Sequence, residues 1–219
     1  MTIDLYYFPL SPPTRATMMV AKAVGVHLNL KVVDITKGEQ FKPEFIRVNP
    51  QHTVPTMDDN GFILSESRTI NGYLVNKYAK NDSLYPKDPK KKGIVDERLN
   101  FDLGTLYSRL FDCYIPVTFG LSSVIHQNDI EAIEEAFDKL NGFLEMGEFV
   151  AGDNLTIADF SVIISVSMAE IWGFDITRYN NVVIWYERCK QVLQKYEFDR
   201  INAPAKQLGE WFRANLETI

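Results

Sequence analysis

The sequence is poor in cysteine and has no excess of basic residues. Its two cysteines, Cys113 and Cys189, lie far apart in stretches of helical character, so neither a disulfide framework nor a cysteine metal site is expected. A reducing, cytoplasmic location is therefore favoured. With 23 basic and 29 acidic residues and a net charge of −6, the chain lacks the electrostatic footprint of a nucleic-acid-binding protein.

Long apolar runs are missing as well. No stretch approaches the roughly 18 apolar residues of a membrane-spanning helix, and the most apolar segment, residues 160–168, is interrupted by serines. An early acid, Asp4, and the prolines Pro9 and Pro12 argue against a secretory leader. The sequence therefore predicts a soluble protein with no membrane partner.

Apolar side chains are plentiful enough for a large core, at 46% of 219 residues with 14 Phe and 10 Tyr. The pattern changes at residues 81–90, which are rich in Lys, Asp and Pro. Because the lysines there alternate with aspartates, they indicate a solvated linker rather than a basic patch. We therefore expect an N-terminal domain at residues 1–80 and a second domain at residues 91–219.

Residues 1–80 alternate strand and helix signals. A strand at 3–8, a helix from Pro13 to a glycine C-cap at Gly25 and a strand at 28–33 predict a parallel βαβ unit. Asn60-Gly61 then predicts a hairpin between strands at 54–57 and 62–64. A helix follows at about 70–78, with Ser65 or Ser67 as its N-cap. The order βαβ then ββα predicts a small mixed sheet.

Residues 91–219 show helical patterns alone, which predicts an all-α domain. The expected helices cover residues 90–119, 129–146, 157–172, 182–195 and 203–216. Thr156 and Asp159 have the spacing of a capping box, a structural role.

Three segments of the N-terminal half could carry chemistry, and the first contains Ser11. Because Pro12 precedes a proline, the helix is expected to begin at Pro13 with Ser11 just outside it. A thiolate bound there would be stabilised by the helix dipole and by the hydroxyl. Taken alone, Ser11 is better explained as a residue that only satisfies backbone groups at the helix start.

The second segment is Asn49-Pro50-Gln51-His52-Thr53-Val54-Pro55. If the Val54–Pro55 bond is cis, the backbone of Val54 faces outward and can pair with an extended peptide. The alternatives are an ordinary turn proline and a loop histidine at position 52. The third segment, Glu66-Ser67-Arg68, begins a helix and could hold the charged groups of a small zwitterion. Helix capping and an exposed ion pair explain it as well.

Together these segments resemble the cytosolic glutathione transferases, most closely the insect delta and epsilon classes. The resemblance covers nearly the whole chain. Its most specific parts are Asn49 to Pro55, Asp59-Asn60-Gly61, Glu66-Ser67-Arg68 and the linker Asp82-Ser83-Leu84-Tyr85-Pro86-Lys87. It implies an α/β, thioredoxin-like N-terminal domain that binds glutathione as co-substrate, an all-helical domain with a hydrophobic pocket, a homodimer, and no metal.

The resemblance also implies roles for individual residues. Ser11 donates a hydrogen bond to the glutathione sulfur, and Val54, beside a cis Pro55, pairs with the cysteinyl backbone. Glu66 and Ser67 hold the γ-glutamyl end with Arg68 nearby, and His52 reaches the glycyl end. Gln40 stands where delta-class enzymes often carry a glycyl-contacting histidine. The residues expected to line the hydrophobic site are Leu10, Pro13, Tyr107, Leu110, Ile115, Phe119 and Trp211.

The reaction implied is conjugation of the glutathione thiolate to hydrophobic electrophiles, as in detoxification. Elimination, as in dehydrochlorination, and peroxide reduction by glutathione use the same thiolate and stay open. So does a non-catalytic carrier of hydrophobic ligands, because the same fold supports both. Aromatic residues at helical spacing, such as Tyr107 and Phe119, more often belong to a packed core than to a pocket.

Overall fold

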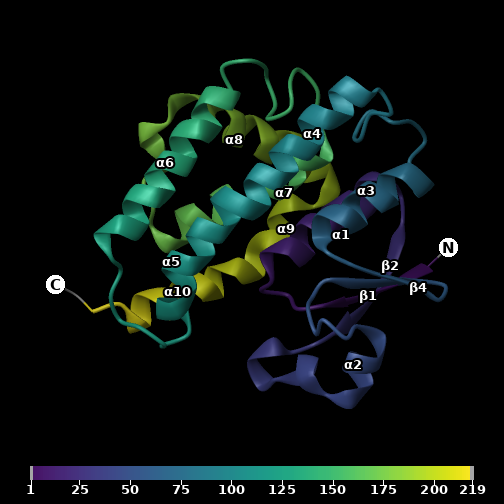
Figure 1. Ribbon diagram of the computed structural model, residues 1–219, viewed down its shortest axis with the longest axis horizontal. Coiled ribbons are helices and arrows are strands. Elements are labelled where there is room, and N and C mark those ends of the chain that lie inside the picture. Colours follow the sequence, from purple (N-terminus) through teal and green to yellow (C-terminus); the bar gives the residue numbers. More distant parts are fainter. Residues whose placement is uncertain (1, 218–219) are drawn as a thin grey trace.

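The protein, studied as a computed structural model that describes residues 2–217, divides into a strand-containing half and a helical half (Figure 1). The first half contains β1 (Thr2–Tyr7), α1 (Pro12–Ala23), β2 (His27–Val32), η1 (Ile35–Lys37), η2 (Glu39–Phe41), α2 (Pro43–Val48), β3 (Thr56–Asp59), β4 (Phe62–Ser65) and α3 (Ser67–Tyr78). The second half contains α4 (Pro89–Phe101), the π-helical segment η3 (Asp102–Tyr107), α5 (Ser108–Thr118), α6 (Gln127–Phe143), α7 (Ile157–Trp172), η4 (Ile176–Arg178), α8 (Asn180–Leu193), η5 (Gln194–Tyr196), α9 (Phe198–Asn202), η6 (Ala203–Ala205) and α10 (Lys206–Asn215).

The sheet has the strand order β2-β1-β3-β4. β1 pairs with β2 in parallel, and β3 runs antiparallel to both β1 and β4. This confirms the predicted parallel βαβ unit and the hairpin. The prediction that the third strand begins at Val54 is wrong. Pairing starts at Thr56, because Pro55 has no backbone N–H to donate to a ladder.

The expected helix at 90–119 is one continuous run, but it is not α-helical throughout. Residues 102–107 form η3 between α4 and α5. Single π-helical turns of this kind are frequent at functional sites. The prediction also missed α9, whose five residues are too few to give a periodic signal.

The centre of the helical half is α7, which is buried along nearly its whole length. Its predicted capping box is confirmed: the Asp159 carboxylate accepts from the backbone N–H of Thr156 at 2.8 Å and also from that of Val150 and the indole of Trp185. These bonds tie the start of α7 to the preceding loop and to α8. Among residues 2–217, none of the helices combines the length and apolarity needed to cross a bilayer.

The two halves meet where α1 and α3 pack against α7. Arg15 of α1 is fully buried at this junction and donates to the Asn202 side chain at 2.8 Å and to the Met168 sulfur at 3.0 Å. Arg68 of α3 reaches across to the carboxylate of Asp102 in η3. Side chains at the start of α1 and α3 are therefore held rigidly beside the helical half.

A buried carboxylate fastens the β3–β4 hairpin to α3. One oxygen of Asp59 accepts from Tyr73 at 2.6 Å, from Lys77 at 2.6 Å and from Tyr78 at 2.5 Å. Burial alone would raise the pKa of Asp59, but these hydrogen bonds outweigh that effect and hold the pKa well below its usual value. Asp59 is therefore ionised in the folded chain, and its charge contributes to stability.

We expect Asp59→Asn to lower the free energy of unfolding by about 2 kcal/mol at neutral pH, because three hydrogen bonds lose their charged acceptor. A carboxylate whose folded pKa is lowered contributes stability above its unfolded pKa of about 3.9, and this is lost as pH falls. The difference in unfolding free energy between the wild type and Asp59→Asn should begin to narrow below about pH 4 and keep narrowing as pH falls further. Urea unfolding at several pH values measures it, and a gap that is constant with pH would contradict this account.

Candidate active site

Ser11 is the N-cap residue of α1, which begins at Pro12, one residue earlier than expected. Its backbone takes part in the start of the helix: the N–H donates to the Phe8 carbonyl at 2.9 Å, and the carbonyl accepts from the Arg15 N–H. Its hydroxyl makes no capping hydrogen bond and no other hydrogen bond within residues 2–217. The capping explanation of this side chain is therefore wrong, and its hydroxyl is free to meet a ligand at the positive end of α1.

The loop before β3 presents a free stretch of backbone. The Val54–Pro55 peptide bond is cis, as expected. Neither the N–H nor the C=O of Val54 is hydrogen-bonded within the described chain, whereas the flanking turn is held by Asn49, whose amide donates to Thr53 and Thr56. A rigid turn thus carries one unpaired peptide unit, which is the arrangement needed for pairing with an extended ligand.

The junction between β4 and α3 is strained. Glu66 is the N-cap of α3 and has φ 68°, a conformation that costs a non-glycine residue about 1–3 kcal/mol and that clusters at functional sites. The predicted cap at Ser65 or Ser67 is wrong, because Ser67 is already the first helical residue and Ser65 contacts Gln51 instead. Glu66 and Ser67 therefore lie together at the helix start, and Glu66 makes no side-chain capping hydrogen bond.

Arg68 is held by the helical half. Its guanidinium donates to one oxygen of Asp102 through Nη2 at 2.5 Å and Nε at 3.2 Å, while Ser165 of α7 donates to the other oxygen at 2.6 Å. Asp102 is fully buried. The exposed ion pair considered for Arg68 is thus wrong: its partner is buried and lies 34 residues away.

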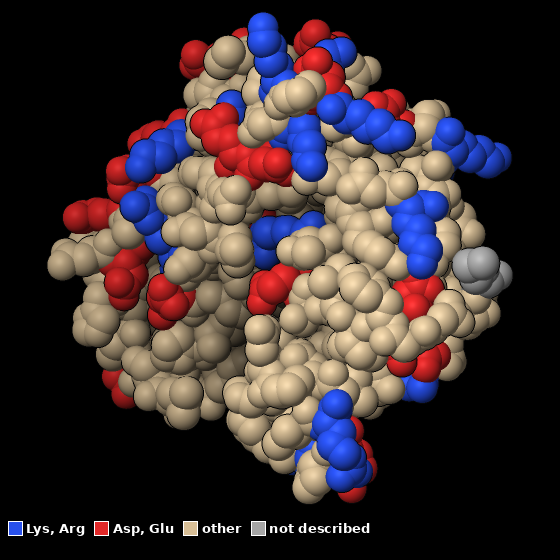
Figure 2. Space-filling model, turned by 45° about the vertical axis from the view of Figure 1, so that its right-hand side comes forward, with Lys and Arg blue, Asp and Glu red and all other residues tan. Residues whose placement is uncertain are grey.

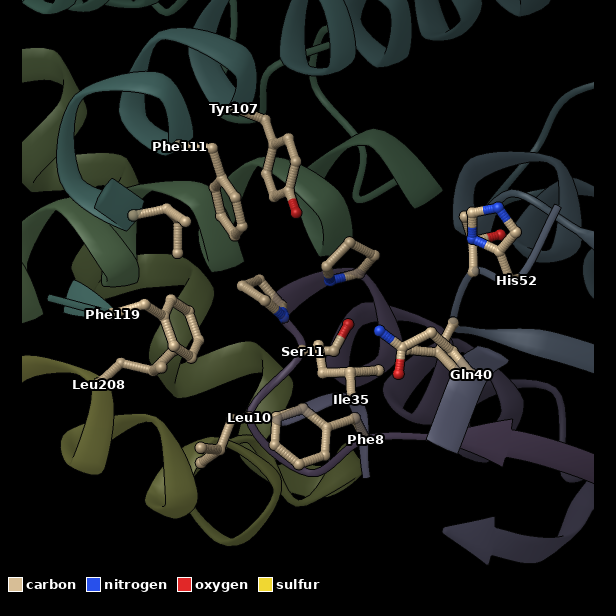
Figure 3. A pocket seen from close by; sticks show the side chains of 15 residues that line it. Phe8, Leu10, Ser11, Ile35, Gln40, His52, Tyr107, Phe111, Phe119 and Leu208 are labelled. Atoms are coloured by element: carbon tan, nitrogen blue, oxygen red, sulfur yellow. The ribbon is translucent and has the colours of Figure 1, made fainter. Parts of the chain in front are cut away.

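A cavity of about 280 Å³ opens between the two halves at the start of α1 (Figure 3). It is lined by Phe8, Leu10, Ser11, Pro12, Pro13, Ile35, Gln40, His52, Thr53, Val54, Tyr107, Phe111, Ile115, Phe119 and Leu208. A much smaller cavity shares Pro12, Pro13 and Tyr107 with it and is also lined by Ser67 and Arg68. The structure therefore gathers residues of the first two predicted segments around one cavity and places Ser67 and Arg68 of the third at the small cavity beside it.

Several predicted residues lie elsewhere. Leu110 does not line the cavity, because its side chain is 1% exposed in the core of the helical half. Trp211 does not line it either; it packs behind Phe119, with ring centroids 5.8 Å apart. Pro55 is buried beside the cavity wall, and Glu66 faces a separate groove between α3 and α4.

Other lining residues were not predicted from the sequence. Phe111 stacks on Tyr107 with centroids 4.0 Å apart, one helical turn later, so the i, i+4 spacing was an available signal. Phe8 and Ile35 follow the first two strands, where side chains of parallel strands meet at one edge of the sheet. Leu208 comes from α10, and nothing in its sequence context marks it.

Two polar residues line the cavity on the side of η2. The Oε1 of Gln40 is buried and has no hydrogen-bond partner in the described part of the chain, which is costly unless a ligand supplies one. His52 has φ 47°, and its ring packs against Phe41 with centroids 5.1 Å apart. The proposal of a merely locally bonded histidine finds no support, since its ring makes no hydrogen bond within residues 2–217.

A second hollow lies between α3 and α4. Figure 2 shows a hollow near the centre of the view, with basic and acidic side chains at its opening and mostly uncharged residues around it. The groove between α3 and α4 measures about 680 Å³ and is lined in part by Glu66 and Arg68, next to the exposed Phe62 and Leu103. In the described chain, no group of three His, Cys, Asp or Glu side chains is placed to hold a metal ion.

Comparison with known proteins gives consistent results. Two family models match, described as "Glutathione S-transferase, N-terminal domain" over residues 1–76 and "Glutathione S-transferase, C-terminal domain" over residues 126–191. Glutathione S-transferase D7 of Anopheles gambiae is 43% identical over 99% of this chain and 100% of its own.

Solved structures agree. A delta-class glutathione transferase of Nilaparvata lugens is 46% identical with a TM-score of 0.91, covering 97% of this chain and 99% of its own. A glutathione transferase homolog of Drosophila mojavensis, solved with bound glutathione, is 33% identical with a TM-score of 0.90. The match covers 100% of this chain and 99% of the homolog's own.

Proposed function

The chain belongs to the glutathione S-transferase family and is a glutathione transferase; from this premise we propose that Ser11 stabilises the glutathione thiolate in the cavity between the two halves. The observation that carries the proposal is the free Ser11 hydroxyl, which opens into the cavity at the N-terminus of α1. A charge-assisted hydrogen bond and the helix dipole both favour a thiolate over a thiol at that point.

The rest of glutathione would extend from Ser11 along the strand-containing half. The unpaired peptide unit of Val54, beside Pro55, would pair with the cysteinyl backbone. The γ-glutamyl end would reach Glu66 and Ser67, where a carboxylate and a helix start can receive an amino group and a carboxylate. Arg68 is engaged by Asp102, so its part would be to position the start of α3.

The glycyl end would lie beside Gln40 and His52. The amide of Gln40 can donate to a carboxylate through Nε2 and leaves Oε1 to accept from a ligand N–H. Since Oε1 is buried and unpartnered without a ligand, binding would relieve that cost.

The second substrate would occupy the apolar part of the cavity, against Leu10, Pro13, Tyr107, Ile115 and Phe119. Among the described residues, no carboxylate, lysine or arginine lines it, so a neutral, hydrophobic electrophile fits best. Reaction then needs no protein base, because the sulfur is already ionised and is held next to the electrophile. Dehydrochlorination and peroxide reduction would start from the same thiolate.

A homodimer and a cytoplasmic location complete the proposal. Exposed apolar side chains around the groove between α3 and α4, such as Phe62 and Leu103, offer a surface for a second copy. Cys113 and Cys189 are both unpaired and buried, which suits a reducing compartment. The relatives named above are transferases by name, so the alternative of a non-catalytic carrier gains no support.

Titration of the bound thiol tests the proposal. We expect the ultraviolet absorbance of the thiolate in the enzyme–glutathione complex to titrate one to two pH units below the pKa of about 8.5 of a free thiol. A bound thiol that ionises no more readily than free glutathione would refute the role of Ser11.

A further inference from the structure

Two further hollows lie along the linker that joins α3 to α4, which crosses from the strand-containing half to the helical half (Figure 1). One, of about 550 Å³, lies between the ends of α1 and α3 and the loop before α7. The other, of about 510 Å³, lies between the linker, the start of α4 and the same loop. Ser83 and Asn154 line both hollows, so the two adjoin and form one groove, the linker groove.

The linker groove is separate from the candidate active site. Among the described residues, none that lines it also lines the cavity at Ser11 or the groove between α3 and α4. It therefore belongs neither to the proposed glutathione site nor to the surface proposed for a second copy of the chain.

The two ends of the linker groove carry charges of opposite sign. Lys80 and Lys195 line the end beside α1. Asp82, Asp88 and Asp153 line the end beside α4. Within residues 2–217, none of these five side chains takes part in a salt bridge. A ligand that lies along the groove can therefore meet an opposite charge at each end.

Other charges in the linker groove are balanced within the protein. Lys22 lines the basic end but is paired with Glu197 at 2.7 Å. Lys91 lies among the aspartates of the acidic end, where Asp88 caps α4 by accepting from the Lys91 N–H at 3.0 Å. Helix ends nearby carry about half a charge each, which is too little to cancel the remaining charges. Each end thus keeps charge that a ligand can meet.

Both walls of the linker groove also present unpaired backbone. Neither the N–H nor the C=O of Asn81, in the linker, makes a hydrogen bond within residues 2–217, and the same holds for Asn154, in the loop before α7. The Asn81 side chain accepts from the Ser83 N–H at 3.1 Å and keeps its Nδ2 to donate. Exposed peptide units of this kind are the groups with which an extended chain pairs.

We propose that the linker groove binds an extended peptide segment of another protein, with acidic side chains at one end of the segment and basic side chains at the other. Hydrogen bonds to the backbone of Asn81 and Asn154 hold the chain, and the charges at the two ends select it. Because residues of both halves line the groove, the bound segment joins them at the linker.

Fluorescence anisotropy with labelled peptides tests the proposal on the intact chain. The probe is a peptide of about eight residues, ~26 Å long when extended, with two glutamates at one end and two lysines at the other. It is used in both chain directions and compared with an isomer in which the same four charges are interleaved. We expect one direction to bind with Kd on the order of 10 μM, at least about tenfold tighter than the interleaved isomer.

Lys80→Glu and Asp153→Lys each reverse one charge, at opposite ends of the linker groove. Both side chains are exposed and lie outside the proposed active site, so folding and transferase activity should be unchanged. Each variant should weaken binding of the probe by about tenfold or more. Lys206→Glu is the matched control: it changes the net charge as Lys80→Glu does, but Lys206 lies exposed on α10 and does not line the groove, so Kd should change less than about twofold.

Several results would overturn the proposal. Equal affinity for the probe and its interleaved isomer would show that the arrangement of charges is not recognised. An all-glutamate peptide that binds as tightly as the probe would make the basic end alone the site. An equal loss in Lys206→Glu, or no binding of either probe direction below about 1 mM, would refute it too. None of these results bears on the proposed function, because no residue of the linker groove takes part in it.

Discussion

Ser11→Ala is expected to lower kcat/KM with glutathione and a generic electrophile by about 10- to 100-fold at neutral pH. The hydrogen bond from a hydroxyl to a thiolate contributes about 1.5–3 kcal/mol, and 1.36 kcal/mol corresponds to one pKa unit. Losing it should raise the pKa of the bound thiol by one to two units. The thiolate fraction at neutral pH then falls, by up to about tenfold for each unit. Folding should be unaffected, because the backbone bonds of residue 11 persist and its hydroxyl makes no capping bond.

The pH profile shows whether Ser11 acts through ionisation. The deficit of Ser11→Ala should shrink as pH rises above about 9, where the thiol ionises without help. Thr14→Val is a control on the first turns of the same helix: its hydroxyl is buried, makes no hydrogen bond and does not line the cavity, so activity should be unchanged. A Ser11→Ala deficit that stays constant across pH would show that the hydroxyl orients the sulfur and leaves its pKa alone.

The second large effect concerns stability. Asp102→Ala should lower the free energy of unfolding by about 3–5 kcal/mol, because it leaves the Arg68 guanidinium, only 12% exposed, without its counter-charge. For a chain of this size that corresponds to a fall of roughly 10 °C in Tm. Because Arg68 immediately follows Glu66 and Ser67, KM for glutathione should rise as well. Thermal unfolding and steady-state kinetics measure the two effects.

Ser165→Ala distinguishes the effect of the Asp102 charge from that of the hydrogen bond that Ser165 donates to it. It removes one donor to Asp102 and keeps the Arg68–Asp102 pair, so the cost should be about 1 kcal/mol. If Asp102→Ala costs no more than Ser165→Ala, the ion pair does not hold the two halves together at this point.

The fold was largely predictable because its signals are local. The alternation of strand and helix patterns, the Asn60-Gly61 turn and the capping box of Thr156 and Asp159 each depend on neighbours within a few residues, and the structure contains all three. The π-helical segment η3 was not predictable, because α- and π-helical turns favour the same residue types and differ only in which carbonyl accepts.

The candidate site, too, was predictable only in part. Ser11, Val54 and Gln40 lie in short segments at the ends of elements, so the sequence indicated where they would be. The partner of Arg68 could not be predicted from the sequence, because Asp102 lies on another element and no local pattern joins the two. The choice between Leu110 and Phe111 also failed, since both are apolar and lie within a turn of Tyr107, and only the packing of the bundle decides which one faces the cavity.

The π-helical segment η3 sets more than the position of Tyr107. A regular helix rotates by about 100° for every residue, so the extra residue held in this turn decides which side of α5 looks toward the strand-containing half. Deletion of one residue here would turn the helix that follows by about 100° and bring other side chains of α5 toward the cavity. A change of helix phase would therefore alter which side chains line the cavity, and with it the substrate range, without substitution of any of them.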